Sequence, residues 1–444
     1  MKTKIAIIAM LLVNVCFGQY GVSTGSYSMV KSNRMNSRNE SGAFSERMII
    51  VEDFVNYHKH KISIPKKEET ELSIDYDNDL LENKNSFVLQ VGLATAIKEN
   101  LTKTSKEVNI SLVVDNSGSM AGNDKLTYVK SAIKTFVRKL ENGMSLSLIT
   151  FSTDARVVIK TEKLESNREK IYQIIDNIQP EGSTNIYAGM MLGYEEIAKT
   201  HNDDKNSRLI LLTDGMVNTG ETSLEKILIA SKRYNDMGIE TSTIGVGSDL
   251  DFDLLRSLAE NGKGSNHFIG DSEIDIQKVF VTELESLLYN IGKNPKITIE
   301  LPKDYVVQKI YGYKPNYISE NKVSIELENL NSGITQVVLC DIEKLKSISS
   351  SEIKVSLEYE KNKKVISSYS TLNYRLGTES TNDEIAKNYS IAVMADALKQ
   401  YAIEYTKGKI PARTNLDKAL KFTDKHTDAS DIDVKRTYDI LKKI

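Results

Sequence analysis

The chain has 444 residues, of which 40% are hydrophobic and 27% charged, and its formal net charge is -3. These are the proportions of an ordinary globular protein, and the length is sufficient for two or three domains with sizeable cores. The charge is close to neutral, and there is no basic run and no stripe of basic and aromatic residues, so nucleic acid is excluded as an expected partner. After the first residues, no apolar run approaches the ~20 residues of a membrane helix.

Residues 1–18 have the pattern of a signal peptide, which predicts export. Two lysines precede an apolar core at residues 5–15, and small residues follow at Cys16 and Gly18. Cleavage before Gln19 would place the mature protein in the periplasm, the cell envelope or the extracellular medium. The alternative is a lipoprotein acylated at Cys16, although the residues before this cysteine match the usual Leu-small-small sequence poorly.

Residues 19–45 are rich in Ser, Gly and Asn, and this composition predicts a flexible arm. The arm contains the pattern Gly-x-Ser-x-Gly at residues 21–25, which also occurs at the nucleophile of serine hydrolases. That nucleophile needs a strand before it and a helix after it, and neither is expected here. We therefore interpret the match as chance.

Residues 46–106 form a flanking segment with a helix predicted at 48–55 and a strand at 87–91. His58 and His60 are spaced as a metal-binding pair, but no acidic residue or cysteine lies near them in the sequence, and we expect both to be exposed. The acidic residues that follow resemble the start of a calcium-binding EF-hand loop. They lack the required glycine and glutamate, which predicts only an acidic loop at Asp75, Asp77 and Asp79.

The next segment, Val108 to Met120, carries the strongest functional signal in the chain. Ile110, Leu112, Val113 and Val114 form a short apolar and mostly β-branched run, as in a buried parallel strand. The strand ends at Asp115, and Ser117 and Ser119 follow at spacings of two and four. One carboxylate and two hydroxyl groups are hard oxygen ligands, which suit Mg²⁺. The same residue types also cap helices, and a helix is predicted just downstream, so this turn alone is compatible with capping.

Two later segments favour the metal site. Thr184 lies in a Gly-Ser-Thr-Asn turn before a predicted helix, and Asp214 ends a second apolar strand at residues 208–214. The order Asp-x-Ser-x-Ser, Thr, Asp resembles the metal-ion-dependent adhesion site of von Willebrand factor type A domains. This resemblance implies that five residues bind Mg²⁺ or Mn²⁺, namely Asp115, Ser117, Ser119, Thr184 and Asp214.

Strand and helix patterns alternate through residues 107–290, which predicts an α/β domain with a doubly wound, mostly parallel sheet. The pattern at residues 155–161 indicates an edge strand, and the last helix of the domain is predicted at 273–289. This succession resembles the von Willebrand factor type A fold. The resemblance implies that the strands ending in Asp115 and Asp214 are neighbours, so that a ligand crevice forms where their outgoing connections diverge.

The family resemblance also assigns roles. Ser117, Ser119 and Thr184 would bind the ion directly, while Asp115 and Asp214 would hold it largely through water and hydrogen bonds. An ion bound mainly by neutral oxygens remains electrophilic at its outward position, where it would attract a carboxylate of a partner.

Residues 295–375 have the short, partly alternating apolar segments of antiparallel strands, and they predict a small β-sandwich-like domain. The strand at 87–91 is a candidate member of the same domain, in which case the α/β domain is an insertion. Cys340 lies in one of the apolar segments. A lone cysteine in this setting is expected to be a core residue.

Residues 381–444 form a C-terminal helical segment with an apolar face that includes Ile391, Leu398 and Ala402. We expect this face to pack on its own domain, although it offers an alternative role in recruiting a partner helix. Together with the segment from Glu52 to Tyr57, the layout resembles the bacterial exported YfbK-type group of von Willebrand factor type A proteins.

Three functions follow from these features. The first is an exported, non-enzymatic binding protein that captures an Asp or Glu carboxylate of a protein partner through Mg²⁺ or Mn²⁺. The second is a structural or assembly protein of the cell envelope in which the α/β domain is a scaffold. The third is a metal-dependent hydrolase, which the sequence disfavours: Ser117 stands where a related phosphatase has a second Asp, there is no nucleotide loop, and His267, predicted near the rim, has no recognisable nucleophile beside it. No catalytic residue and no organic cofactor are therefore expected.

Overall fold

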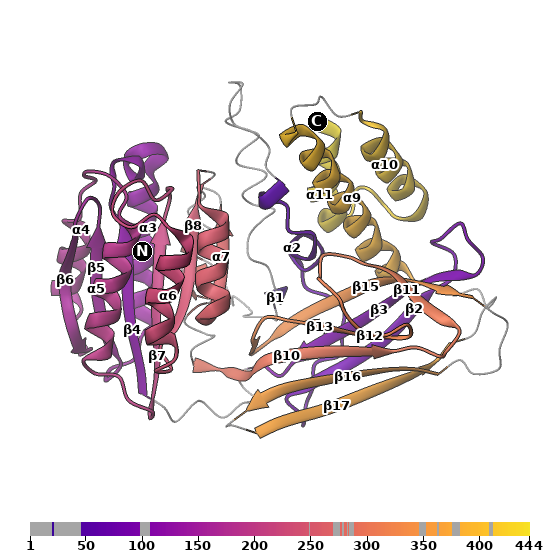
Figure 1. Cartoon of the computed structure of the whole chain (residues 1–444), viewed down its shortest axis with the longest axis horizontal. Helices are drawn as coiled ribbons and strands as arrows, with labels where there is room; N and C mark the ends of the chain where they lie inside the picture. Colours follow the sequence, from indigo (N-terminus) through magenta and orange to yellow (C-terminus); the bar gives the residue numbers. More distant parts are fainter. Residues whose placement is uncertain are drawn as a thin grey trace, which may run out of the picture.

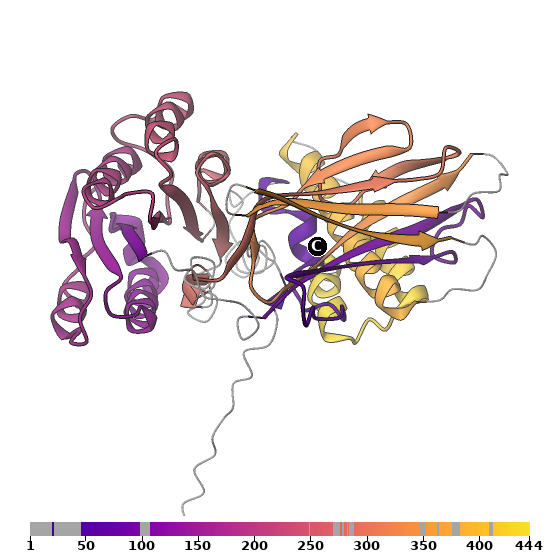
Figure 2. The same ribbon diagram turned by 90° about the horizontal axis from the view of Figure 1, so that it is seen from below.

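The computed structural model places two bodies side by side, an α/β domain and a β module that carries the C-terminal helices (Figures 1 and 2). The described residues are 20–21, 46–97, 107–247, 249–269, 276–277, 279–281, 283, 288–345, 352–361, 364–374, 382–407 and 412–444. The predicted signal peptide lies outside these residues, as does the predicted arm except for residues 20–21, which form the short strand β1. In the described part of the chain, no helix is both long and apolar enough to span a membrane.

The α/β domain (residues 107–289) is built on a six-stranded sheet in the order β6-β5-β4-β7-β8-β9. Every neighbouring pair is parallel except β5 and β6, so the predicted edge strand is antiparallel. The central strand is buried along almost its whole length, in agreement with its apolar sequence. The strands are β4 (Glu107–Asp115), β5 (Ser145–Phe151), β6 (Ala155–Lys163), β7 (Lys205–Thr213), β8 (Glu240–Val246) and β9 (Lys263–Ile269).

Helices cover both faces of this sheet, because successive residues of β4 point to opposite sides. Ile110, Leu112 and Val114 share a core with helices α3 and α4, whereas Val113 packs in the core formed with α5, α6 and α7. The predicted last helix is helical at its described residues 276–277, 279–281, 283 and 288. The other helices are η3 (Gly118–Asp124), α3 (Lys125–Lys139), α4 (Glu169–Asp176), α5 (Ile186–Ala198), α6 (Leu224–Asn235) and α7 (Phe252–Asn261).

The β module consists of two packed sheets, and their facing side chains form a shared apolar core. The first sheet contains β1 (Tyr20–Gly21), β15 (Ile334–Lys344), β3 (Ser86–Thr95), β2 (Thr70–Asp77) and β11 (Tyr305–Ile310). The second contains β12 (Asn316–Ser319), β13 (Lys322–Glu326), β10 (Asn290–Glu300), β14 (Leu330–Asn331), β16 (Glu352–Lys361) and β17 (Lys364–Asn373).

The strand predicted at 87–91 lies in β3, which pairs with β15 in an antiparallel register from Ser86↔Glu343 to Ala94↔Thr335. These two strands are separated in the sequence by the whole α/β domain. The β module is therefore assembled from two segments, and the α/β domain is inserted between them.

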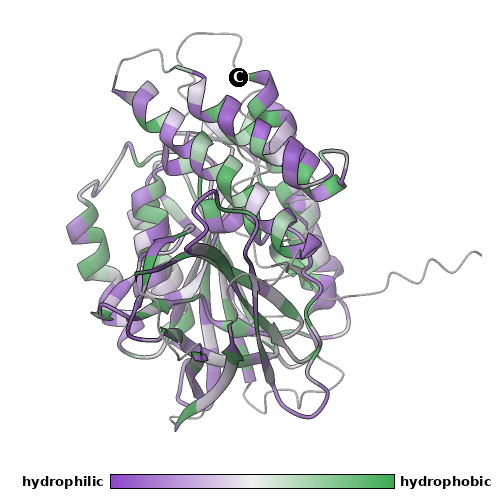
Figure 3. Ribbon diagram, turned by 90° about the vertical axis from the view of Figure 1, so that its right-hand side faces the viewer, coloured by the Kyte–Doolittle hydropathy of each residue, from purple (hydrophilic) through white to green (hydrophobic). Residues whose placement is uncertain are grey.

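A long helix packs on the first sheet and on the short N-terminal helix α2 (Val51–Val55), and two further helices pack on the long one. They are α9 (Asp383–Thr406), α10 (Thr414–His426) and α11 (Ile432–Lys443). Hydrophobic and hydrophilic residues both occur along these helices (Figure 3). One side of α10 and of α11 is buried, whereas most residues of α9 are buried between Ile385 and Leu398. Ile391, Leu398 and Ala402 of α9 are buried, so the apolar face covers its own domain.

The packing corrects three expectations from the sequence: the acidic loop, the exposure of the two histidines after α2, and the position of His267 near a rim. Asp75 and Asp77 belong to strand β2 rather than to an acidic loop. Asp77 is buried, and both of its carboxylate oxygens accept hydrogen bonds from the backbone. Oδ1 accepts from the N–H of Asp79 at 2.8 Å, and Oδ2 accepts from the N–H of Asn382 at 3.1 Å.

Cys340 is a fully buried core residue, as expected, and burial raises the pKa of its thiol.

His58 and His60, predicted to be exposed, are 7% and 1% exposed. They belong to the segment after α2 and lie against the start of α9, and burial lowers the pKa of both imidazoles. The prediction failed because the covering residues are more than 300 positions further along the chain.

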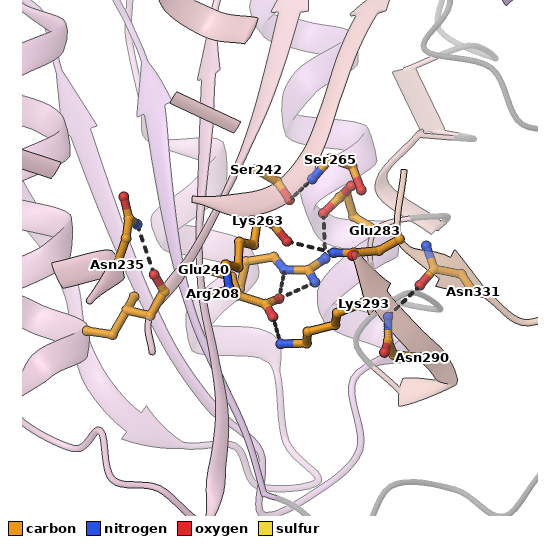
Figure 4. A network of polar contacts seen from close by, with 12 residues as sticks. Arg208, Asn235, Glu240, Ser242, Lys263, Ser265, Glu283, Asn290, Lys293 and Asn331 are labelled. Atoms are coloured by element: carbon orange, nitrogen blue, oxygen red, sulfur yellow. Dashed lines mark hydrogen bonds and ion pairs between the residues drawn. The ribbon is translucent and has the colours of Figure 1, made fainter. Parts of the chain in front are cut away.

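His267, predicted near a rim, is also buried. It binds Glu283, which with Arg208, Glu240 and Lys293 forms a polar network at the junction between the α/β domain and strand β10 (Figure 4). Its Nε2 lies 2.7 Å from Oε1 of Glu283, and the second carboxylate oxygen of Glu283 lies 3.2 Å from the guanidinium of Arg208. Arg208 also binds Glu240, which is bonded in turn to Lys293 of β10. The network thus fixes charged side chains of both bodies to one another.

A cavity of about 730 Å³ lies beside this junction, between α7 and the β module. Its lining includes Glu52, Arg256, Lys263 and Glu328, and none of the five predicted metal ligands. It is therefore separate from the predicted metal site.

Candidate metal site

Strands β4 and β7 end side by side at the centre of the sheet, since they pair in parallel from Glu107↔Lys205 to Val114↔Leu212. The chain after β4 continues into α3 on one face, and the chain after β7 continues towards α6 on the other. Connections that diverge in this way leave a crevice at the carboxyl end of the strands, where ligands bind in doubly wound folds.

Asp115 is fully buried at the base of this crevice. Its Oδ1 accepts a hydrogen bond from the backbone N–H of Ser117 at 2.7 Å, and its Oδ2 accepts one from the hydroxyl of Thr213 at 2.5 Å. Burial raises the pKa of Asp115 to about 6, in the same direction as the charge of Asp214, although the bonds from Ser117 and Thr213 lower it. These bonds hold the carboxylate in one orientation and fix the turn that carries the two serines.

The hydroxyl groups of the turn connect Asp115 to the second strand. Oγ of Ser117 and Oγ of Ser119 lie 3.1 Å apart, and the hydroxyl of Ser119 donates to Oδ1 of Asp214 at 2.7 Å. Asp214 and Ser117 are buried, whereas Ser119 is exposed. The oxygen atoms of the site therefore form a connected row that begins at the buried carboxylate of Asp115 and ends at the hydroxyl of the exposed Ser119.

The third loop brings Thr184 to the same place. The backbone carbonyl of Gly182 accepts from the N–H of Gly118 at 3.2 Å, and the N–H of Thr184 donates to Oδ1 of Asn218 at 2.8 Å. A Cβ atom added to Gly215 would lie 3.3 Å from Oγ1 of Thr184 and 3.8 Å from Oγ of Ser119. Both hydroxyl groups thus border Gly215, and any side chain at this position would narrow the space between them.

The electrostatics of the site favour a cation. The site contains the carboxylates of Asp115 and Asp214 and the ammonium of Lys125, whose Nζ lies 2.7 Å from Oδ2 of Asp214. The ammonium balances the charge of one of the two carboxylates. The other carboxylate has no opposite charge among Lys125 and the five candidate ligands, so the site as a whole is negative. Two carboxylates and three hydroxyl groups are oxygen ligands of the kind that Mg²⁺ and Mn²⁺ prefer, so the residues present fit such an ion.

The structure brings together all five residues singled out from the sequence, and it adds three that the sequence did not indicate. Lys125 opposes Asp214, Thr213 orients Asp115, and Asn218 positions the backbone of Thr184. Only Thr213 had a detectable signal, since it directly precedes Asp214 at the end of the strand. A lysine at the start of a helix and an asparagine in a loop have no pattern that predicts these contacts.

Residues 109–282 match the family model of the von Willebrand factor type A domain. The chain is similar to the uncharacterized protein YfbK of Escherichia coli, with 28% identity over 295 residues that cover 65% of this chain and 50% of YfbK. An uncharacterized protein of Synechocystis sp. is 33% identical over 180 residues, or 40% of this chain and 42% of that protein. The chain thus spans half or less of the length of these two relatives.

The fold is also similar to a solved structure described as a von Willebrand factor type A protein from Catenulispora acidiphila. The TM-score is 0.57 with 16% sequence identity, and the match covers 86% of this chain and 91% of that one. This similarity extends beyond the α/β domain and therefore includes parts of the β module or the helices. Residues 109–282 accordingly constitute a von Willebrand factor type A domain, in a chain that is similar to YfbK over 295 residues.

Proposed function

We propose that this protein is an exported, non-enzymatic binding protein that captures a carboxylate of a protein partner through Mg²⁺ or Mn²⁺. The ion would be held by Asp115, Ser117, Ser119, Thr184 and Asp214. Export is supported by the signal-peptide pattern of residues 1–18.

The observation that carries the proposal is the hydrogen bond of 2.7 Å between Ser119 and Asp214, which are 95 positions apart in the sequence. Together with the contact of 3.1 Å between Ser117 and Ser119, it brings oxygen atoms of two loops to one point, which supports their role as ligands. Such preorganisation lowers the cost of ordering the ligands when an ion binds.

The bound ion would supply a positive centre for the partner's carboxylate. The chain's own residues make this centre accessible, because Ser119 lies at the solvent side while the carboxylate of Asp214 is buried behind it. Met216 follows Gly215 and is 57% exposed, which gives the rim an apolar contact for the residues around the captured group. A charged group at the centre and an apolar side chain beside it is a common composition for a protein-binding site.

The same geometry gives no support to hydrolysis. The described side chains that bond to the five site residues are Thr213, Asn218 and Lys125. None of these is a histidine, cysteine or second carboxylate placed to act as general base or nucleophile.

Titration with Mg²⁺ by calorimetry tests the metal site. We expect the mature chain to bind one ion, and Asp115→Ala and Thr184→Ala to lower the affinity by at least tenfold. Ser183→Ala is the matched control, because it removes the hydroxyl next to Thr184 and outside the ligand set. Unchanged affinity in both site variants would contradict the proposal, provided that circular dichroism shows them to be folded.

Capture of a partner is tested separately, by affinity purification from the native cell envelope with Mg²⁺ or with a chelator. A partner that is retained only with Mg²⁺ is cross-linked, and its contact carboxylate is replaced by the amide. We expect this replacement to abolish retention. Met216→Ser should weaken retention while leaving Mg²⁺ affinity unchanged, because it alters the rim and not the ligands.

A second candidate is a structural or assembly role in the envelope, in which the metal is dispensable. The ion pair between Lys125 and Asp214 favours it, since an ammonium already neutralises one ligand of the site. A partner that co-purifies equally well with and without chelator, and with the Thr184→Ala variant, would support this role over carboxylate capture.

A further inference from the structure

Two buried histidines and a glutamate meet where the segment after α2 packs against the first turn of α9. His58, His60 and Glu384 each offer a ligand atom, and these three atoms lie within 4.8 Å of one another. The rings of the two histidines have centroids 4.6 Å apart. The cluster belongs to the β module and its helices, and it shares no residue with the site of the α/β domain.

The hydrogen bonds of Asn56 determine which nitrogen of His60 is available. Oδ1 of Asn56 accepts from the backbone N–H of Val337 at 2.8 Å, and its Nδ2 donates to the carbonyl of Val337 at 3.3 Å. The same Oδ1 lies 2.9 Å from Nε2 of His60, so this nitrogen must carry the proton. Nδ1 of His60 is left with a free lone pair, and it is buried without a hydrogen-bond partner among the described residues.

His58 is held in the same way. Its Nε2 lies 3.1 Å from Oδ1 of Asn388, whose Nδ2 donates to Oε1 of Gln90 at 2.8 Å. With the amide of Asn388 in this orientation, Nε2 of His58 donates its proton to the amide oxygen, and Nδ1 is the nitrogen with the lone pair. Histidines that bind metals are oriented by this arrangement, in which the second ring nitrogen donates to a carbonyl or carboxylate oxygen.

Glu384 supplies the anionic member of the cluster. Its Oε1 is buried without a hydrogen-bond partner in the described part of the chain, while its Oε2 lies 3.6 Å from Nζ of Lys61. The side chain of Lys61 is 83% exposed and that of Glu384 is 17% exposed, so this ion pair is open to solvent on one side. A buried carboxylate oxygen without a partner is costly, and a bound cation would satisfy it.

We propose that His58, His60 and Glu384 bind a first-row transition-metal cation of the Zn²⁺ class. Two neutral imidazole nitrogens and one carboxylate oxygen are a common three-ligand set for zinc, with water in the fourth position. Ligand bonds of ~2.0–2.1 Å in a tetrahedron place the ligand atoms about 3.4 Å apart, so the cluster needs shifts of about 1 Å to close around the ion. Mg²⁺ is disfavoured because it selects oxygen ligands.

Binding at this point would have a structural consequence. The histidines follow α2 near the start of the β module, and Glu384 begins the C-terminal helices, so the ion joins two distant parts of the chain. An ion that binds the folded state and not the unfolded chain raises the midpoint of thermal unfolding.

Competition between the protein and a chromophoric chelator for Zn²⁺, in excess Mg²⁺ to saturate the oxygen-ligand site, tests the proposal on the full mature chain. We expect one Zn²⁺ per chain, and an affinity at least tenfold lower in His60→Gln and Glu384→Gln. Glutamine at position 60 can still donate to Asn56 while it lacks the Nδ1 lone pair. Zn²⁺ should also raise the unfolding midpoint of the wild type and not that of the variants.

His201→Gln is the matched control, because both ring nitrogens of His201 already have partners, Oγ of Ser207 and the carbonyl of Met237, each at 2.8 Å. It should retain wild-type Zn²⁺ affinity. Equal Zn²⁺ affinity in the wild type and in Glu384→Gln would overturn the proposal, and this partly exposed position decides the outcome even if His60→Gln does not fold. Anomalous scattering at the zinc edge from a position other than the cluster would overturn it as well.

Discussion

The ammonium of Lys125 lies 2.7 Å from Oδ2 of Asp214, whose other carboxylate oxygen accepts the hydrogen bond of Ser119. The side chain of Asp214 is fully buried and that of Lys125 is 16% exposed, so solvent screens this pair only weakly. Lys125 is also the first residue of α3, and its position depends on the same turn that carries the two serines. The lysine therefore neutralises part of the negative charge that would attract a metal ion.

The first prediction concerns this competition. Lys125→Met keeps an aliphatic side chain and removes the positive charge, so repulsion between the ammonium and a divalent ion disappears. We expect Mg²⁺ to bind on the order of tenfold more tightly, from a change of about 1–2 kcal/mol in a partly buried site. Calorimetric titration measures the effect.

Lys130→Met is a suitable control, since this lysine of the same helix binds the carbonyl of Asp176 at 2.9 Å, away from the site. Weaker Mg²⁺ binding in Lys125→Met than in the control would show that the lysine supports the ligand geometry rather than competing with the ion.

The second prediction concerns the contact between helix α5 and the sheet. A Cβ atom at Gly193 would lie 2.4 Å from Cγ2 of Val113 and 2.9 Å from Cδ1 of Leu209, so Gly193→Ala must displace buried side chains. We expect a loss of about 1–2 kcal/mol in the free energy of unfolding, because overpacking costs ~1–3 kcal/mol and exceeds the gain in helix propensity. Urea denaturation of the α/β domain measures this change.

The control is Gly122→Ala, where an added Cβ meets no atom within 4 Å and the φ of -72° is accessible to alanine. Its free energy of unfolding should stay within about 0.5 kcal/mol of the wild type. A Gly193→Ala variant as stable as this control would show that α5 can move away from the sheet without cost.

The third prediction concerns acid stability. Burial raises the pKa of Glu283, but the hydrogen bond with His267 and the charge of Arg208 outweigh it and hold the pKa at about 2. Because the pKa of Glu283 is 4.5 in the unfolded chain and about 2 in the folded one, the charged carboxylate stabilises the folded state at pH values above 4.5. This stabilisation is lost as the pH falls from 4.5 towards 2. Glu283→Gln should remove on the order of 3 kcal/mol at pH 7, and the two proteins should converge near the acid end.

Urea denaturation at a series of pH values measures this difference. Glu195→Gln, an exposed position on α5, is the control and should follow the wild-type curve. A constant difference in the free energy of unfolding between Glu283→Gln and the wild type from pH 7 down to pH 2 would mean that Glu283 contributes by packing and not by its charge.

His267 gives the acid stability a second pH dependence. Burial lowers the pKa of its imidazole, but the bond with Glu283 outweighs burial and raises this pKa overall. The stabilisation from the charged imidazole is therefore complete below pH 6.5 and declines as the pH rises through the raised pKa.

The fourth prediction concerns the insertion of the α/β domain. The hydroxyl of Thr95 at the end of β3 donates to the carbonyl of Asn331 at 2.6 Å, and Asn331 pairs with Asn290 at the start of β10. The end of β3 therefore lies next to the strand that pairs with the start of β10. A Gly-Ser linker of about six residues, which spans ~13 Å on average, can replace residues 98–288.

We expect the shortened protein to unfold cooperatively with the circular dichroism of a β-rich protein with helices, because its core lies between its own two sheets. The excised α/β domain should bind Mg²⁺ with the affinity of the whole chain. An aggregated β module without a cooperative transition would show that the two bodies depend on each other to fold.

The sequence by itself indicated the elements of the α/β domain and the five residues of its candidate metal site. The apolar run at residues 110–114 defines the central strand, and Asp115, Ser117 and Ser119 at its end form a pattern that is local in the chain. Such patterns are legible because the periodicity of apolar residues reports how each segment is buried. Metal binding by these residues remains a prediction.

Only the tertiary structure decided which distant segments meet. The pairing of β3 with β15, the ion pair of Lys125 with Asp214 and the approach of Glu384 to His58 all join residues far apart in the sequence. His58 was expected to be exposed because no neighbour in the sequence marks it as buried. The periodicity of apolar residues indicates that a side chain is buried. Which residue packs against it depends on how whole helices and strands pack together, and this leaves no signal in the neighbouring sequence.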